Sequence, residues 1–266
     1  MTFVTQNLLL VNTAAEMLPF VIQISDLHLG ASWRSGDPAG ALARAVEVVN
    51  AFPATPEAVL VTGDLTDVAT AENYALAREG LSRLEAPFHV LPGNHDERQL
   101  IRAAFDLPGA GADPIQYALD LASFRILMLD TIVPGSDGGA LDGGRLEWLG
   151  SEMAREPERP TLVAMHHPPL ATTVPVWDQI ALASADREAL ERLVAANPQV
   201  VGFVAGHLHR TVLTTLAGRP VLAILSVYEQ ARLDFGLTEF EMSADPPGFA
   251  VHTLVDGRLV SHLQPF

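Results

Sequence analysis

Short apolar runs alternate with longer amphipathic segments along the N-terminal part of the chain. The runs have the length of buried strands. They are residues 20–25, 57–63 and 87–93. Two segments between them carry helix-start signals, with Pro38 opening residues 38–52 and Thr70 near the N-cap of residues 70–84. This alternation is typical of a mostly parallel sheet covered by helices.

The middle of the chain continues the same rhythm. Further strands are expected at residues 124–130, 160–167 and 200–209. A glycine-rich loop at 135–144 precedes a helix around 145–155, and a second helix is expected at 184–196. No internal repeat or low-complexity tract interrupts the pattern, so we predict an α/β fold built around one core.

From about residue 211 the pattern changes to short strands without long helices. Segments 249–255 and 258–263 flank Asp256-Gly257, which is a hairpin signal. We therefore divide the chain into three parts. They are an N-terminal extension at 1–19, which we expect to be dispensable at least over 1–16, a core at 20–210, and a β-rich part at 211–266. We expect the last part to add antiparallel strands and an oligomer contact.

Composition narrows the class of protein. The 266 residues are 48% hydrophobic and 18% charged, which is typical of a globular chain with a substantial core. No cysteine is present, which excludes disulfides and thiolate metal sites and fits a reducing compartment. No apolar run approaches the ~20 residues of a membrane-spanning helix. The N-terminus lacks the basic segment of a signal peptide. We expect a cytoplasmic protein with no membrane partner.

The net charge is −16, and all sixteen positively charged residues are arginines. Such an acidic surface repels nucleic acid and anionic lipid unless a local patch or bound metal reverses the field. A small substrate held at a cationic site fits this charge better than a nucleic-acid polymer.

Polar side chains with metal-binding chemistry follow five of the predicted strands. They are Asp26 and His28; Asp64 and Asp67; Asn94, His95 and Asp96; His166 and His167; and His207 and His209. In open α/β sheets function gathers at the carboxyl ends of the strands. Because six of the nine histidines lie at these ends, a shared site explains their distribution better than scattered core positions do.

The residue types indicate the chemistry. Imidazole with carboxylate suits borderline divalent metals such as zinc, iron or manganese, and the lack of thiolates argues against a structural zinc finger. One ion would leave several ligands unused, whereas two ions sharing a bridging carboxylate would use them, and Asp64 is the best bridge. Asn94 would serve as a neutral oxygen ligand. His95 is then free to contact a substrate phosphate and to protonate the leaving oxygen.

The blocks "DLH", "GDLTD", "GNHD", "MHHPPL" and "GHLH" resemble, in this order, those of the calcineurin-like metallophosphoesterase superfamily. The chain is similar in particular to the bacterial class III cyclic-nucleotide phosphodiesterase and glycerophosphodiesterase group. The similarity runs from about residue 20 to the end and includes "ENYALAREGL" and "DPPGFAVHTLVDGRLVSHLQP". The resemblance implies a four-layer αββα sandwich with two central sheets and helices outside.

The resemblance also implies roles for single residues. Two divalent ions (Fe, Mn, Zn or Co) would bind per chain. One would be held by Asp26, His28, Asp64 and His209, and the other by Asp64, Asn94, His166 and His207. His95 would stabilise the phosphate and protonate the leaving group. Asp67 matches the position that orients this histidine, and Asp96 is the competing candidate. The "GD" block lacks the Arg-Gly of Ser/Thr protein phosphatases, which weakens the assignment of Asp67.

Several other residues keep two interpretations. His167 either supports the metal ligands or faces away from them, because neighbours in a strand point to opposite sides. Trp33, Arg34 and Trp177 either touch the substrate or belong to loops. We expect the last three histidines to lie in the core or beneath helices. They are His89, His252 and His262.

The function predicted from this pattern is hydrolysis of small-molecule phosphodiesters, such as 3′,5′-cAMP or a glycerophosphodiester. A metal-bridging hydroxide would attack the phosphorus, and His95 would protonate the leaving group. The alternatives on the same fold are a phosphomonoesterase or protein phosphatase, a DNA nuclease, and a non-catalytic scaffold. A nuclease should carry a basic stripe and a scaffold should have lost ligands, whereas this sequence shows neither feature. We also expect a homodimer or a higher homo-oligomer.

Overall fold

Two sheets lie face to face in the computed structural model, which describes residues 18–32 and 36–266. The first sheet has the order β13-β12-β1-β2-β3. Its strands are β1 (Phe20–Ile24), β2 (Ala58–Thr62), β3 (Phe88–Leu91), β12 (Gly248–Val255) and β13 (Arg258–Pro265). β1, β2 and β3 are parallel, whereas β12 and β13 join them in antiparallel pairs.

The second sheet has the order β4-β5-β6-β7-β9-β8. Its strands are β4 (Tyr117–Asp120), β5 (Arg125–Leu129), β6 (Thr161–Met165), β7 (Val200–Ala205), β8 (Val212–Leu216) and β9 (Arg219–Ala223). β5, β6, β7 and β9 are parallel. A small separate pair is formed by β10 (Gln230–Ala231) and β11 (Met242–Ser243).

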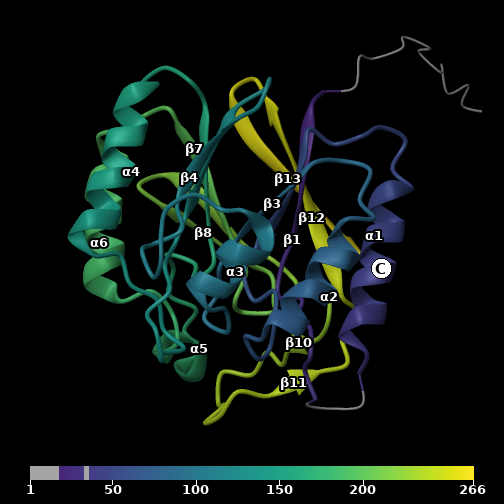
Figure 1. Ribbon diagram of the computed structural model, residues 1–266. Coiled ribbons are helices and arrows are strands. Elements are labelled where there is room, and N and C mark those ends of the chain that lie inside the picture. The colour runs from purple at the N-terminus through teal and green to yellow at the C-terminus, as the bar shows by residue number, and fades with distance from the viewer. Residues whose placement is uncertain (1–17, 33–35) are drawn as a thin grey trace, which may run out of the picture.

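Helices cover the outer faces of both sheets (Figure 1). α1 (Pro38–Asn50) and α2 (Ala71–Leu81) lie outside the first sheet, and α4 (Gly143–Arg155) and α6 (Ser184–Ala195) lie outside the second. The short helices α3 (Arg98–Phe105) and α5 (Pro175–Gln179) follow site loops. The expected α/β fold, a four-layer sandwich, is confirmed. Every helix within the described ranges is too short or too polar to cross a membrane.

Local sequence explains where these helices begin and end. The Asp37 and Thr70 side chains cap α1 and α2 by accepting hydrogen bonds from the backbone N–H groups of Gly40 and Asn73. Both helices end two to three residues before the predicted ends, at Asn50 and Leu81.

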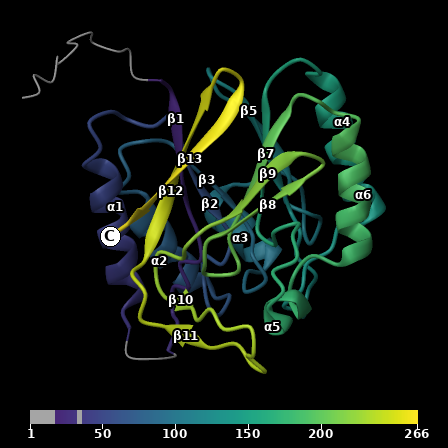
Figure 2. The same cartoon turned by 180° about the vertical axis from the view of Figure 1, so that it is seen from behind.

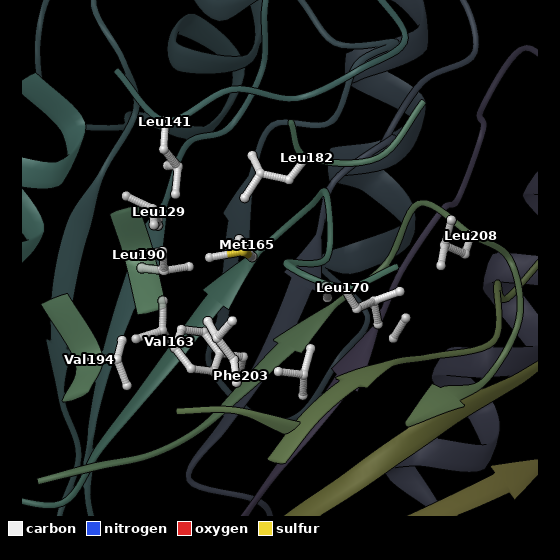
Figure 3. Close-up of a cluster of buried hydrophobic side chains, with 14 of the residues drawn as sticks. Leu129, Leu141, Val163, Met165, Leu170, Leu182, Leu190, Val194, Phe203 and Leu208 are labelled. Carbon is white, nitrogen blue, oxygen red and sulfur yellow. The ribbon is translucent and has the colours of Figure 1, made fainter. Parts of the chain in front are cut away.

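Three apolar layers form the core. One lies between the sheets and includes Val21, Leu60 and Leu162, and a second lies beneath α1 and α2. The third packs strand residues against α4 and α6 (Figure 3). There Leu129, Val163 and Phe203 meet Leu190 and Val194 of α6. Because both faces of the central strands are covered, β1, β2, β5 and β6 are buried along their whole length.

The C-terminal strands are divided between the sheets. β8 and β9 extend the second sheet, whereas β12 and β13 extend the first. The hairpin predicted at Asp256-Gly257 is confirmed, since both residues have left-handed backbones (φ 50° and 72°) between β12 and β13. His252 is buried as expected, but His262 is exposed on the edge strand β13, so its expected burial is wrong. Of the proposed N-terminal extension, residues 1–17 lie outside the described residues.

Candidate metal centre

The carboxyl ends of β1, β2, β3 and β7 open into a cavity of about 430 Å³. The β10–β11 pair and α5 lie at this end of the molecule in both views (Figures 1 and 2). Six of the cavity-lining residues were predicted as ligands or as the acid. They are His28, Asp64, Asn94, His95, His207 and His209.

The first expected ligand group is assembled. Asp26, His28, Asp64 and His209 are all buried, and each offers one ligand atom within 4.8 Å of the others. His28 Nε2 is 3.0 Å from His209 Nε2 and 3.6 Å from Asp64 Oδ2, and His209 Nε2 is 3.8 Å from Asp26 Oδ1. Two carboxylates and two imidazoles in this arrangement fit a borderline divalent ion.

The second expected group meets the first at Asp64. His166 Nε2 lies 2.9 Å from Asn94 Oδ1 and 3.3 Å from Asp64 Oδ2. The His207 ring centroid is 4.9 Å from that of His166. Because the same Asp64 oxygen also faces His28 Nε2, this carboxylate lies between the two groups, where a bridging ligand would be.

The hydrogen bonds behind the histidines provide an independent test of whether these residues fit metal ions. Each candidate histidine engages one ring nitrogen with an oxygen of the protein. The pairs are His28 Nδ1 with Asp67 Oδ1 (3.1 Å), His166 Nδ1 with the Thr62 carbonyl (2.8 Å), His207 Nε2 with the Ile180 carbonyl (2.8 Å) and His209 Nδ1 with the Glu229 carbonyl (2.7 Å). Such a bond fixes the ring and its tautomer and leaves the other nitrogen as the ligand atom. The donor set therefore fits two ions.

Backbone strain is concentrated at these residues. Five candidate ligands have left-handed backbones although none is a glycine. They are Asp26 (φ 57°), His28 (48°), Asp64 (50°), His207 (72°) and His209 (47°). Such conformations cost roughly 1–3 kcal/mol each and persist only where the surroundings enforce them. Neighbouring glycines are required for space, because a Cβ at Gly93 would lie 2.2 Å from Asp64 Oδ1, and one at Gly206 1.8 Å from Ser25 Oγ.

The buried charges also indicate a cation site. Burial raises the pKa of Asp26 to about 6, although His166 opposes this shift. Burial disfavours the charged form of His166, but Asp64 and Asp26 outweigh it and raise the pKa of His166 to about 9. The pKa values of His207 and His209 fall to about 3 and 4 because both rings are buried. Near neutral pH the centre thus combines buried carboxylates with the neutral rings of His207 and His209 and a protonated His166, and metal binding would displace the proton on His166.

His95 lies at the cavity wall with 37% of its side chain exposed. Its Nδ1 is 2.9 Å from the Asp67 backbone carbonyl, which leaves Nε2 as the other ring nitrogen. The Asp67 carboxylate contacts His28 Nδ1 at 3.1 Å and His95 Nδ1 at 3.6 Å. Asp67 therefore touches both rings, His95 through its carbonyl and its carboxylate and His28 through its carboxylate.

The Asp96 carboxylate lies inside the protein. It accepts hydrogen bonds from the N–H groups of Gly93 (2.9 Å) and Leu65 (3.1 Å) and from the Tyr74 hydroxyl (3.0 Å). These contacts fasten the "GNHD" turn to the "GDLTD" turn. The observed contacts of Asp96 are those of a clamp between loops, whereas it was expected to compete with Asp67 for orienting His95.

The residues left open by the sequence have different surroundings. Both ring nitrogens of His167 are engaged, with Thr131 Oγ1 at 2.8 Å and the Asp137 carbonyl at 3.1 Å, although the ring also lies within ligand distance of His166 and His207. Trp177 is buried behind the cavity in the core beneath α4 and α6. Trp33 and Arg34 lie outside the described residues.

Sequence reasoning missed two groups near the centre. Asp130 follows β5 as Asp64 follows β2, and it forms a buried ion pair with Arg98, four residues beyond Asn94. The signal for this pair was present, because "MLD" is one more strand that ends in an aspartate. The second group comes from the C-terminal part, where Thr238, Glu239, Phe240 and Met242 line the cavity, and no pattern in the sequence pointed to them.

Comparison with known proteins identifies the family. The sequence profile described as Calcineurin-like phosphoesterase matches residues 21–211. The chain belongs to this family. The membership predicted from the five sequence blocks is therefore confirmed, and curated relatives are named as phosphodiesterases.

Curated relatives cover most of the chain. A probable glycerophosphodiester phosphodiesterase of Arcobacter nitrofigilis is 31% identical over 87% of this chain and 87% of its own. The 3′,5′-cyclic adenosine monophosphate phosphodiesterase of Escherichia coli K12 is 29% identical over 97% of this chain and 94% of its own. Among solved structures, a dimetal phosphatase from Danio rerio superposes with a TM-score of 0.67 at 16% identity, covering 93% of this chain and 96% of that one. The last likeness supports the fold.

Proposed function

We propose that this protein hydrolyses small-molecule phosphodiesters, such as a cyclic nucleotide or a glycerophosphodiester, with two divalent metal ions. Asp26, His28, Asp64 and His209 would hold one ion, and Asp64, Asn94, His166 and His207 the other. The two ligand groups that share Asp64 support this assignment. When bound, the ions would supply the positive charge that polarises the phosphate and activates a water molecule.

His95 would act on the leaving group. Its Nδ1 is held by the Asp67 carbonyl, so a proton on Nε2 would be available to the oxygen that departs from phosphorus. Its partly exposed position in the cavity wall supports contact with the substrate. Asp67 would orient the ring through this carbonyl and would orient His28 through its carboxylate.

The charge of the cavity is the observation that favours a diester over a monoester as the substrate. Its described lining contains four carboxylates (Asp64, Asp67, Asp137 and Glu239) and no arginine, and the chain has no lysine. A phosphate monoester carries about −1.5 to −2 charges at pH 7, whereas a diester carries a single one. Because the carboxylates that do not hold ions repel anions, the cavity favours the less charged substrate.

The size and walls of the cavity support a small substrate. A volume of about 430 Å³ is within the usual range of small-molecule sites. Val176, Ile180, Phe240 and Met242 provide apolar surface beside the polar centre, where the organic part of a diester would pack. With a net charge of −16, the protein is poorly suited to a DNA backbone.

We also propose that the protein is a homo-oligomer. The edge strands β8 and β13 carry exposed apolar side chains, with Leu213 68% and Leu263 39% exposed. Unpaired edges of this kind are usually covered in the functional assembly. Light scattering should show at least a dimer at micromolar concentration, and a monomer would refute this part of the proposal.

A substrate panel tests the function. Metal-loaded protein should be assayed with 3′,5′-cAMP, 2′,3′-cAMP, a glycerophosphodiester and bis(p-nitrophenyl) phosphate. p-Nitrophenyl phosphate and supercoiled DNA would represent the competing activities. We expect kcat/KM to be higher on the diesters than on the monoester, with two ions per chain by metal analysis. Faster monoester hydrolysis, or DNA cleavage without diester turnover, would refute the proposal.

A further inference from the structure

A buried ion pair joins the two sheets beside the metal centre. Arg98, the first residue of α3, extends from the "GNHD" loop of the first sheet, and Asp130 follows β5 of the second. Arg98 Nε lies 2.8 Å from Asp130 Oδ2, and Arg98 Nη2 lies 2.8 Å from Asp130 Oδ1. The side chains are 6% and 0% exposed, so this bidentate pair is shielded from water.

The hydrogen bonds around the pair are extensive. Asp130 also accepts from the N–H groups of Ile115 (2.8 Å) and Ile132 (2.9 Å), and Arg98 Nη2 donates to the Ile132 carbonyl (2.8 Å). Removing two charges from water costs several kcal/mol per ion, and well-packed apolar residues often stabilise a fold at least as well. Net stability alone is therefore a weak reason for this pair, whereas its directional geometry suits the positioning of a loop.

A closed chain of contacts leads from the pair to the second ligand group. On one side, Arg98 belongs to the segment that carries Asn94. On the other side, Asp130 is followed by Thr131, whose hydroxyl is 2.8 Å from His167 Nδ1. His167 is next to His166, whose Nε2 is 2.9 Å from Asn94 Oδ1. These contacts therefore connect the loop that carries Asn94 to the loop that carries His166.

We propose that the Arg98–Asp130 pair and the Thr131–His167 contact are positioning elements that hold Asn94 against His166. This inference rests on the proposed function, because it assumes that Asn94 and His166 bind the same ion. Asp26, His28 and His209 lie on other loops, outside this series of contacts. Loss of the pair should therefore weaken one ion site much more than the other.

The other end of β5 offers a matched control. Arg125, the first residue of the strand, pairs with Glu152 of α4, and the two side chains are 4% and 12% exposed. Arg125 Nη1 also donates to the Glu152 carbonyl at 2.6 Å. This pair is a buried ion pair on the same strand, but it does not line the cavity. Neutralising it should leave the metal centre unchanged.

The experiment compares the double variants R98M/D130N and R125M/E152Q. Each keeps side chains of similar size and removes both charges of one pair. Melting temperatures would be measured first, followed by calorimetric titration of the metal-free proteins with Mn²⁺. In R98M/D130N we expect one of the two affinities to fall by about 10–100-fold, as is typical for groups that orient metal ligands. In R125M/E152Q we expect both affinities to stay at the wild-type value, whatever the change in melting temperature.

A milder pair of variants keeps the proposal testable if R98M/D130N does not fold. Thr131→Val removes the hydroxyl that contacts His167 and preserves the side-chain shape, whereas Thr131→Ser keeps the hydroxyl. We expect the valine variant to weaken the same single ion and the serine variant to restore it. Equal weakening of both ions, or no change relative to the control, would overturn the positioning role. A wild-type chain that binds only one ion would instead contradict the proposed function itself and the inference with it.

Discussion

The carboxyl and amino ends of the central parallel strands are both buried, yet they are built differently. At the carboxyl ends five non-glycine residues have left-handed backbones, and buried carboxylates face imidazoles. At the amino ends none of the described residues flanking β1, β2, β3, β5, β6 or β7 has such a backbone. Five of the nine non-glycine residues with left-handed backbones in the described part of the chain are therefore candidate ligands at the carboxyl ends, whereas Ala217 and Asp256 lie in hairpin turns. A fold tolerates such local costs where function requires them and packs regularly elsewhere.

The most severe way to break the carboxyl end is Asp64→Ala. This carboxylate faces both ligand groups, so its loss should reduce the binding of both ions. Activation of water and stabilisation of charge are each worth several kcal/mol, so we expect kcat/KM to fall by more than about 10⁴-fold. Metal analysis and diester assays would check this. A variant that keeps two tightly bound ions would contradict the bridging position.

His95→Gln should damage turnover without damaging the metal centre. General acid catalysis is worth about 10²–10⁴-fold, and its value depends on how much the leaving group needs a proton. We therefore expect a large defect on 3′,5′-cAMP or a glycerophosphodiester and a much smaller one on bis(p-nitrophenyl) phosphate. Metal content should match that of the wild type. Equal defects on both substrates would leave His95 with a role in phosphate binding alone.

Packing at the amino ends of the strands can be disrupted by Leu162→Ala, because Leu162 lies near the start of β6. Leu162 is fully buried between the sheets, so truncation should lower the free energy of unfolding by about 2–5 kcal/mol. Denaturant unfolding would measure the loss. Because the site is built at the opposite end of the strand, ion affinities and KM should stay at wild-type values under native conditions. A change in metal content at this position would show that the two ends are coupled.

The smallest expected effect is the pH dependence of stability that His252 causes. His252, away from the centre, is buried with Nε2 on Gln23 Oε1 (3.0 Å) and Nδ1 on Ser261 Oγ (2.8 Å), and burial lowers its pKa to about 3. As pH falls from about 6.5 towards 3, the unfolded chain takes up a proton that the folded chain does not, so stability is lost. His252→Gln removes this contribution. Relative to pH 7, the wild type should lose ~2 kcal/mol more than the variant by pH 5.

Unfolding curves of both proteins at several pH values would test this. The histidines and carboxylates of the metal centre are the same in both chains, so their titration cancels in the difference. Parallel stability curves between pH 7 and pH 5 would show that His252 does not remain neutral in the folded protein.

Much of the fold could be predicted because its signals are local. Alternating apolar runs and capped amphipathic segments placed the strands and helices of the first half within a few residues of their positions. Side chains at strand ends were predicted to converge because parallel strands bring these ends to one edge. Contacts between residues far apart could not be predicted in this way. The clamp made by Asp96, the Arg98–Asp130 pair and the cavity lining from 238–242 are of this kind.

The sequence by itself determined the chemistry of this protein, because imidazoles, carboxylates and an amide after buried strands have few other uses. The tertiary structure decided which groups each of these side chains contacts. Two adjacent histidines differ only in their surroundings, since His166 keeps one ring nitrogen facing Asn94 and Asp64, whereas His167 uses both nitrogens on Thr131 and Asp137. Both rings follow β6 and lie only 4.9 Å apart, so the difference comes from the groups that engage their nitrogens, which belong to distant parts of the chain. That assignment follows from packing in three dimensions.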